Sequence, residues 1–466
     1  MNLLQKFRGV IALIKLVDSF KRKLKNIGRE TLHWYALSPI VNGELWYPKS
    51  EFLEFLESNQ FSYIHKKKRS KSYAGQIHRL WTKAEILECT GDFHLAQKIK
   101  TDILQDSWEK HNLKVGEYVP PFIDSYWLKA FGHQGCLGYF AMAQKLNIIH
   151  QSRRTIIDIN QANICRPIMD PILENFEHYK SINSDSIFNH PNLFFLTEKI
   201  TMLATKIGFL SLPEMIELTL KSAGEINAGE ILYTLSTENQ NTARNLLVKL
   251  GLPKEAWFVG LHVRDGWRMN ERNADIESYF SSINHITRSG GWVIRIGDSS
   301  MRSIKHLANV IEIFNNSENF SILQDYVLSN SKFFISTSSG PSVFPPLFGV
   351  PMLSTNMVAV SKNNFSYLAP SLAIPKVWVE RVSNRDVSLE DSFELDLGFV
   401  ENSESKTGAF FTRNNTSEEI LAATIEMFNV LEGTPSEPSV RQNSLRILRR
   451  ESGAVTFGDF AESFLN

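Results

Sequence analysis

A group of charged residues follows the hydrophobic segment WFVGLHV (257 to 263), which is typical of a buried strand. His262 and Arg264 stand at the carboxyl end of this predicted strand. In a doubly wound α/β sheet, ligands bind outside the carboxyl ends of the strands. Arginine carries a fixed charge and a planar fork of donors that suits phosphate oxygens. Arg264 is therefore a candidate phosphate ligand, and the alternative is an arginine that pairs with Asp265 or Asp298 at the sheet end.

A second polar element follows another predicted strand, KFFIST (332 to 337). Ser338, Ser339 and Gly340 then form a short polar turn before a predicted helix. Backbone amides and hydroxyls at such a turn attract phosphate. A serine-rich turn is otherwise a helix cap or a loop. Together with Arg264, however, this turn could neutralise a diphosphate without a metal ion.

Composition and the missing motifs exclude several classes of function. The chain has no Asp-x-Asp at a strand end, no HExxH, no paired Cys/His set and no glycine loop with lysine, so we expect no metal, no other cofactor and no nucleoside triphosphate hydrolysis. A formal net charge of zero gives no bulk reason to bind nucleic acid. Cys89, Cys136 and Cys165 suit a reducing compartment. We therefore expect a cytoplasmic protein without a nucleic-acid partner.

Two α/β units are expected to position these residues, because 466 residues are too many for one hydrophobic core. In the second unit (251 to 432), predicted helices or turns separate five apolar strands. Strands that alternate with helices indicate a mostly parallel, doubly wound sheet. Thr416 begins a further helix, with Glu419 in the capping-box position. The five predicted strands are 257 to 263, 292 to 298, 310 to 314, 332 to 337 and 350 to 355.

The first α/β unit (119 to 250) shows a similar opening. We predict an apolar strand that ends at Phe131, a glycine-containing turn and a helix from about Cys136. The segment TIIDI (155 to 159) follows as a second strand. Two such units in tandem form a cleft between them, so the fold class is α/β with two doubly wound Rossmann-like domains facing that cleft.

Three motifs then carry a family resemblance: GLHVRDGWRMNERNADIESYF (260 to 280), WVIRIGD (292 to 298) and FFISTSSGPSVFPPLFGVP (333 to 351). They resemble the donor domain of the fucosyltransferase group of two-domain GT-B glycosyltransferases, which includes core-fucosylating, nodulation and protein O-fucosylating members. The chain is still more similar to a bacterial glycosyltransferase-like family associated with surface polysaccharide. FGHQG (131 to 135) resembles the turn that opens the acceptor domain of that group. The resemblance covers residues 125 to 430 and implies a GT-B-like fold.

The resemblance also implies residue roles. Arg264 would contact the β-phosphate, His262 would orient that loop, and Asp298 would lie near the nucleoside or the sugar. Ser338 and Ser339 would reach the diphosphate. The remaining substrate-binding candidates are Arg268, Arg272, Asn273, Asp325 and Gly340.

Some of these candidates also have a purely structural interpretation. Asp325 is the weakest of them, and we expect it to start a helix. Arg268 and Arg272 are either solvated loop charges or part of a lid, ERNAD (271 to 275), that folds over the donor.

The expected reaction is transfer of a sugar from a nucleotide-diphosphate donor to a hydroxyl of a glycan or lipid-linked glycan. Inversion of configuration at the sugar needs a base. The candidates are His133, Asp265, Glu271 and Asp275. His133 could instead bond the backbone of its turn, and Asp275 could be a helix N-cap.

Asp265 occupies a position where many fucosyltransferases of this group have a second basic residue. The donor is therefore either GDP-fucose or another nucleotide sugar. This departure also supports an alternative in which the protein is a non-catalytic glycan-binding or scaffold protein. A third possibility is an enzyme that modifies the sugar nucleotide itself, such as an epimerase.

Segments outside the two α/β units complete the expected organisation. Residues 1 to 30 form a basic amphipathic pattern, which is typical of a helix on an anionic membrane surface or of a packing helix with a solvated basic face. Residues 31 to 118 are predicted to be helical, with one tetratricopeptide-like unit at 79 to 104. Residues 433 to 466 form a tail expected to dock on the body. Under the first of these two alternatives, residues 1 to 30 would contact the inner face of the cytoplasmic membrane peripherally.

Overall fold

The computed structural model divides the chain into two compact units, Met1–Ala96 with Glu401–Gly408 and Gln97–Val400 with Ala409–Asn466. The predicted helix at 1 to 30 and the tetratricopeptide-like unit lie outside the described residues. Among the described helices, none combines the length and the apolar composition needed to cross a membrane. The structure describes residues 40–41, 44–45, 121–123, 128, 130–146, 156–158, 164, 167–179, 194–196, 202–205, 208–211, 232–266, 272–358, 370–395, 397, 409–451 and 459–465.

The described part of the first unit is a small antiparallel pair, β1 (Ile40–Val41) with β2 (Glu44–Leu45). The prediction of helix is therefore wrong at these four residues. Asn42 and Gly43 lie between the strands in the sequence, and Asn-Gly is a strong signal for a tight hairpin connection. That local signal outweighs the helical pattern around it.

A seven-stranded parallel sheet forms the main body of the second unit, with the order β11-β10-β9-β12-β13-β14-β18. The first five strands along the chain confirm the five predicted ones, whereas β14 and β18 were not predicted. The strands are β9 (Phe258–His262), β10 (Trp292–Gly297), β11 (Val310–Phe314), β12 (Phe334–Ser336), β13 (Met352–Met357), β14 (Ser371–Pro375) and β18 (Asp459–Phe460).

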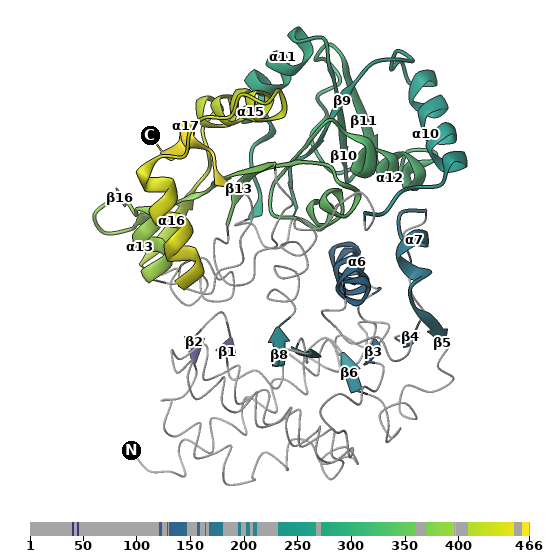
Figure 1. Cartoon of the computed structure of the whole chain (residues 1–466). Coiled ribbons are helices and arrows are strands. Elements are labelled where there is room, and N and C mark those ends of the chain that lie inside the picture. Colours follow the sequence, from purple (N-terminus) through teal and green to yellow (C-terminus); the bar gives the residue numbers. More distant parts are fainter. Residues whose placement is uncertain are drawn as a thin grey trace, which may run out of the picture. The chain divides into compact units, whose positions relative to one another are not determined.

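Helices cover both faces of this sheet (Figure 1). Alternation along β9 shows why: Phe258 packs in one hydrophobic cluster with residues of α10 and α12, and Val259 and Leu261 pack in another with residues of α11 and α15. Both faces are buried, as a doubly wound sheet requires. The helices are α10 (Thr237–Lys249), α11 (Phe280–Arg288), α12 (Phe320–Asn330) and α15 (Ser417–Leu431).

The chain order reverses at β9. From β9 the chain proceeds outward through β10 to β11, and then returns to place β12 on the other side of β9. The carboxyl ends of β9 and β12 therefore flank the topological switch point of the sheet, where open α/β sheets bind ligands.

A four-stranded parallel sheet in the same unit repeats this topology, with the order β5-β4-β3-β6. Its switch point lies between β3 and β6. The segment predicted at 155 to 159 is confirmed as β4. The strands are β3 (Pro121–Ile123), β4 (Ile156–Asp158), β5 (Glu177–Tyr179) and β6 (Phe194–Leu196), followed by the antiparallel pair β7 (Met202–Thr205) and β8 (Gly208–Ser211).

The predicted strand ending at Phe131 is wrong, because α6 (Phe131–Lys145) begins at that residue. Gly132 and Gly135, which suggested a turn, and Gly138, which was predicted to be helical, lie three residues apart along α6 and allow close packing. A Cβ built at Gly132 would lie 3.0 Å from the Gly340 Cα, and one at Gly135 would lie 2.8 Å from Val343 Cγ1. Packing of α6 against the 3₁₀ helices η6 (Gly340–Val343) and η7 (Pro345–Phe348) thus outweighs the low helix propensity of glycine.

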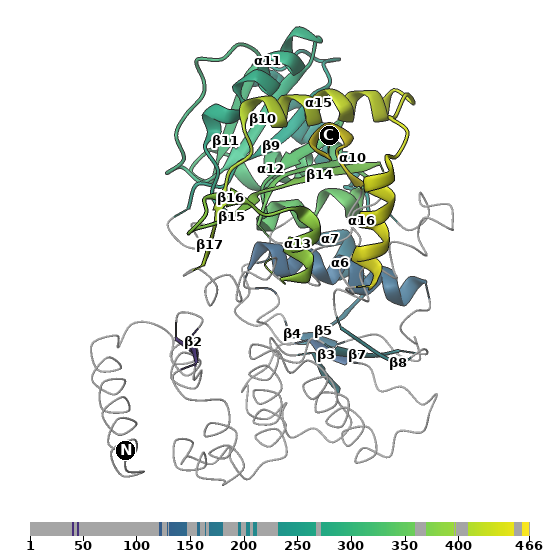
Figure 2. The ribbon, with the colours of Figure 1, turned by 90° about the vertical axis from the view of Figure 1, so that its left-hand side faces the viewer.

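The last part of the chain returns to the sheet. The segment β18 pairs with β14, and the helices beside it contact one another and α15 (Figure 2). An antiparallel sheet of three strands lies between β14 and α15 in the sequence. These elements are β15 (Val377–Glu380), β16 (Arg385–Asp386), α13 (Leu389–Glu394), β17 (Phe410–Arg413), α16 (Val440–Glu451) and α17 (Glu462–Leu465).

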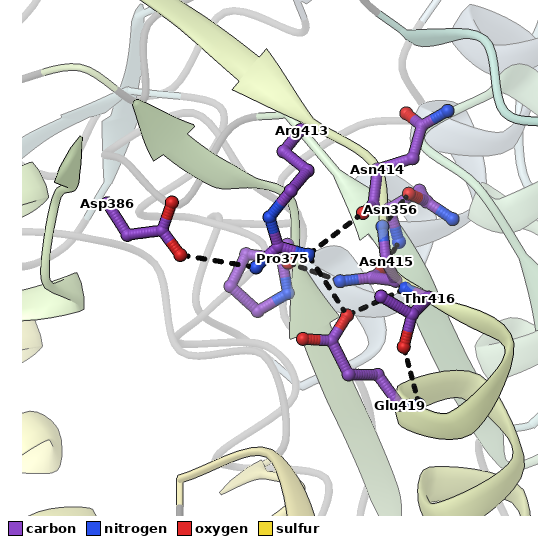
Figure 3. A network of polar contacts seen from close by, with 8 residues as sticks. All are labelled: Asn356, Pro375, Asp386, Arg413, Asn414, Asn415, Thr416 and Glu419. Atoms are coloured by element: carbon purple, nitrogen blue, oxygen red, sulfur yellow. Dashed lines mark hydrogen bonds and ion pairs between the residues drawn. The ribbon is translucent and has the colours of Figure 1, made fainter. Parts of the chain in front are cut away.

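A polar network joins the end of β13 to the start of α15 (Figure 3). Asn356 and Asn415 each accept a backbone N–H of the other, at 2.6 and 2.8 Å, and both residues are buried. The predicted capping box is confirmed: Thr416 Oγ1 accepts the Glu419 N–H at 3.2 Å, and Glu419 Oε2 accepts the Thr416 N–H at 2.7 Å. The start of α15 is thereby fixed at the carboxyl edge of the sheet.

Candidate functional site

The two polar elements predicted from the sequence lie side by side at the β9–β12 switch point. Ser336 of β12 is paired with His262 of β9. The Thr337 N–H donates to the His262 carbonyl at 3.2 Å, and the Arg264 N–H donates to Thr337 Oγ1 at 3.1 Å. The segments that carry Arg264 and Ser338–Gly340 therefore leave the sheet together.

His262 connects three segments at this point. Its Nδ1 lies 3.1 Å from the Ile296 carbonyl, which can only accept, so Nδ1 carries the proton and donates. In the neutral ring Nε2 is then an acceptor, and the Ser339 hydroxyl donates to it at 3.0 Å. The sequence predicted that His262 orients the Arg264 loop, which stays a prediction; its side chain contacts the turn that carries Ser339.

Burial keeps this imidazole neutral. Desolvation lowers the pKa of His262 from 6.5 to about 4, and the nearby positive charges of Arg295 and Arg264 act in the same direction. The hydrogen bond to Ile296 opposes the shift, with a smaller effect than burial. At neutral pH the uncharged His262 ring therefore accepts the hydrogen bond of the Ser339 hydroxyl and holds that residue in position.

This neutral histidine predicts a loss of stability in acid. The unfolded chain binds a proton at His262 near pH 6.5 and the folded chain only near pH 4, so the folded state loses stability as the pH falls through that window. The loss approaches about 3 kcal/mol, at 1.36 kcal/mol per pKa unit. We expect urea denaturation at pH 7 and pH 4.5 to show it as a steeper fall for the wild type than for His262→Gln, which cannot titrate. Parallel falls for the two proteins would contradict the assignment.

The turn after β12 offers several hydrogen-bond donors. Ser338, Ser339 and Gly340 are half-exposed, and their backbone amides have no acceptor among the described residues. Ser342 fixes the turn, because its hydroxyl and its backbone N–H both donate to the Ser339 carbonyl, at 2.6 and 3.1 Å. A fixed turn with three amides available can bind an anion without reorganising.

The Arg264 loop is closed by its own ends. The Gly266 N–H donates to Asn273 Oδ1 at 3.0 Å, and Asn273 Nδ2 donates to the Gly266 carbonyl at 2.6 Å. The Ala274 N–H donates to the Arg264 carbonyl at 3.0 Å. The guanidinium of Arg264 folds back over Gly266, where a Cβ would lie 3.2 Å from Arg264 Nη2. Arg264 and Asn273 thus belong to one structure, here called the paired loop ends (264–266 and 272–274).

The start of α6 brings His133 to the same place. The contact between Gly132 and Gly340 joins the first turn of α6, which follows β3, to the turn that follows β12. Tyr139 donates from its hydroxyl to the Val343 carbonyl at 3.2 Å and strengthens this contact. His133 is half-buried in that first turn of α6. The helical turn that carries the candidate base therefore packs against the candidate anion-binding turn.

The other predicted site residues make local contacts, are exposed or half-buried, or lie outside the described residues. Asp275 caps the 3₁₀ helix η5 (Ile276–Tyr279), since its carboxylate accepts the Glu277 N–H at 3.0 Å. Asp298 accepts from the Ser300 N–H at 2.9 Å and from Asn315 Nδ2 at 2.6 Å, and the first of these bonds lowers its pKa. Asp265 is exposed and Arg272 is half-buried. Arg268 and Glu271 lie outside the described residues.

The prediction for Asp325 is wrong in one respect. The helix α12 begins at Phe320, so Asp325 lies in its interior and does not start it. Its side chain is fully buried, and Oδ2 accepts the Ile168 N–H at 2.8 Å. This carboxylate joins α12 to the segment before α7 (Asp170–Leu173).

Three residues that support the site or the sheet beside it were not predicted from the sequence. Thr337 holds the Arg264 backbone, Lys376 donates from Nζ to the Asn273 carbonyl at 2.7 Å, and Glu312 forms a buried ion pair with Arg295 at 2.8 Å. Glu312 interrupts the apolar run VIEIF, which is a signal for a buried charge. Lys376 follows a strand that was not predicted, so no pattern pointed to it.

Metal ligation has no candidate in the part of the chain that the structure describes. No group of three or more His, Cys, Asp or Glu side chains there could hold an ion. The absence of a metal requirement therefore stays a prediction from the sequence.

Comparison with known proteins gives remote likenesses only. No family model and no curated protein matches the chain. A family 9 glycosyl transferase from Veillonella parvula DSM 2008 superimposes with a TM-score of 0.41 and 12% identity, over 68% of this chain and 98% of its own. An iron-containing dodecameric heptosyltransferase in complex with ADP-D-β-D-heptose gives 0.35 and 12%, over 67% and 77%. The E. coli ADP-heptose LPS heptosyltransferase II gives 0.32 and 10%, over 55% and 90%.

Proposed function

We propose that the protein is a glycosyltransferase that binds the diphosphate of a nucleotide sugar at the β9–β12 switch point. The observation that carries the proposal is that Arg264 and the turn of Ser338, Ser339 and Gly340 follow adjacent, paired strand ends, which the Arg264–Thr337 hydrogen bond joins. A guanidinium and three backbone amides can together stabilise the charge that develops on a leaving diphosphate. His262 would keep the Ser339 hydroxyl in place without adding a charge.

The acceptor is proposed to approach from the side of α6. The first turn of this helix follows β3, and its Gly132 contacts Gly340. His133 is then the base candidate best placed to take the proton of an acceptor hydroxyl. Asp275 is less suited, because its carboxylate already caps η5. We propose a glycan or lipid-linked glycan of bacterial surface polysaccharide as the acceptor, on the resemblance of the motifs.

The finer assignments follow the same motifs. We propose an inverting reaction without a metal ion, carried out in the cytoplasm, with GDP-fucose or another nucleotide sugar as the donor. Residues 1 to 30 would then supply peripheral contact with the membrane that holds a lipid-linked acceptor. Asp265, the exposed residue next to Arg264, stands where many fucosyltransferases have a basic residue, so the identity of the donor sugar is left open.

A panel of nucleotides tests the proposal. We expect calorimetry in EDTA to show that one of GDP, UDP, ADP and CMP binds the full chain, and that the matching nucleotide sugar loses its sugar to an added glycan acceptor. Binding without transfer would favour the glycan-binding or scaffold alternative. An isomerised donor without acceptor would favour the epimerase. Absence of binding by all four nucleotides would overturn the proposed donor site.

A further inference from the structure

A buried cation, Lys376, lies at the carboxyl edge of the sheet. Lys376 follows β14 directly, and only 4% of the residue is exposed. Lysine is almost never buried to this extent without partners, because removing an ammonium group from water is costly. An apolar side chain would fill the same space without that cost. The position therefore indicates a role that packing alone does not explain.

The ammonium of Lys376 is held in a defined place. Its backbone N–H donates to the Met357 carbonyl at 2.9 Å, which ties the residue to the end of β13. Its Nζ donates to the Asn273 carbonyl at 2.7 Å. The strands β14 and β9 are separated by β12 and β13, so their backbones are about 14 Å apart at about 4.8 Å per strand. The lysine thus joins the far part of the edge to the loop that begins at β9.

Asn273 transmits this contact to Arg264. Its side chain exchanges two hydrogen bonds with the Gly266 backbone, and the next residue, Ala274, donates to the Arg264 carbonyl. Ala274 is itself buried in the hydrophobic cluster that contains Val263. The paired loop ends are therefore fixed from the core side by Ala274 and from the edge of the sheet by Lys376.

We propose that Lys376 is a positioning residue that fixes the paired loop ends and thereby aims Arg264 at an anionic ligand. The anionic ligand is the diphosphate of the proposed function, so the affinity part of the inference rests on that function. The structural part, that Lys376 orders residues 264–266 and 272–274, is independent of any ligand.

The first test needs no ligand and compares Lys376→Met with the wild type and with Lys254→Met. Methionine keeps most of the length of lysine without its donors, and Lys254 is an exposed lysine that serves as the matched control. We expect hydrogen exchange of peptides covering 264–266 and 272–274 to accelerate at least tenfold in Lys376→Met, while peptides of β10 stay unchanged. Asn273→Ala, which removes the two hydrogen bonds between the Asn273 side chain and the Gly266 backbone, should accelerate exchange in the same peptides. Unchanged exchange at the paired loop ends in Lys376→Met would overturn the inference.

A double-mutant cycle with Arg264→Ala then tests the link to Arg264. For the nucleotide that binds the wild type, we expect Lys376→Met to weaken binding at least fivefold, and to weaken the Arg264→Ala protein less than twofold further. A similar loss in both backgrounds would mean that Lys376 acts independently of Arg264, and would overturn the link. If no nucleotide binds the wild type, the proposed function fails, whereas the exchange experiment still decides whether Lys376 orders the paired loop ends.

Discussion

Replacement of Glu312 with alanine is expected to lower the free energy of unfolding by about 3–5 kcal/mol, because it leaves a buried arginine without its counter-charge. Both side chains are almost fully shielded from water, at 1% exposure for Arg295 and 0% for Glu312. Glu312 also accepts from the Ser303 hydroxyl at 2.5 Å and from the Ile304 N–H at 3.0 Å. Burial alone lowers the pKa of Arg295, and Glu312 opposes that shift. The measurement is the shift of the urea transition of the full chain.

Two comparisons make this result specific to burial. Glu277 forms an ion pair with Arg302 in which the side chains are 48% and 62% exposed, so Glu277→Ala should cost less than about 1 kcal/mol. The double variant Arg295→Met with Glu312→Leu removes both buried charges and should recover most of the loss. A Glu312→Ala loss no larger than that of Glu277→Ala would contradict the account. The buried charge of Arg295 would then not need Glu312 for its stabilisation.

The strands and their order show what local sequence patterns can predict. The segments that became β9 to β13 are short apolar runs between polar turns, and each packs on both of its faces, so periodicity and composition were sufficient. The strand β18 has two residues, and β14 follows the mixed polar and apolar segment NNFSYLAP (363 to 370), so neither was recognised as a strand. They exist because the edge of an already formed sheet offers them hydrogen bonds.

The start of α6 shows the limit of reading glycine locally. Gly132 and Gly135 predicted a turn ahead of a helix that would contain Gly138, since glycine disfavours a helix by up to about 1 kcal/mol per residue. Their small size is instead used against η6 and η7, which lie about 200 residues further along the chain, in the same way that Tyr139 reaches Val343 across 204 residues. No local pattern contains that partner.

The candidate site was only partly predictable for the same reason. Arg264 and the Ser338–Gly340 turn were identified because each follows a recognisable strand, and the strand order then placed them together. Asp325 was misplaced because its partner, Ile168, belongs to another part of the fold. Lys376 was missed because its contact with Asn273 exists only when β14 is in the sheet.

Arg264→Ala is expected to lower the rate of sugar transfer by about 10² to 10³, the typical effect of removing one group that stabilises developing charge. The Arg264 backbone is held at the switch point by Thr337, next to the turn after β12 where the leaving diphosphate is proposed to bind. The same change should weaken binding of the nucleotide diphosphate at least tenfold, or about 1.4 kcal/mol. Steady-state rates and calorimetry on the full chain measure the two effects.

The geometry of the side chain, in addition to its charge, should contribute to this effect. Arg264→Lys keeps the positive charge and loses the planar fork, so its loss of rate should lie between those of the wild type and Arg264→Ala. Arg288→Ala removes an exposed arginine at the end of α11 and should change neither binding nor rate. The structural alternative makes a different prediction, because an arginine that only stabilises the end of the sheet would change the urea transition and leave nucleotide binding intact. A changed urea transition with intact nucleotide binding in Arg264→Ala would exclude Arg264 from the donor site.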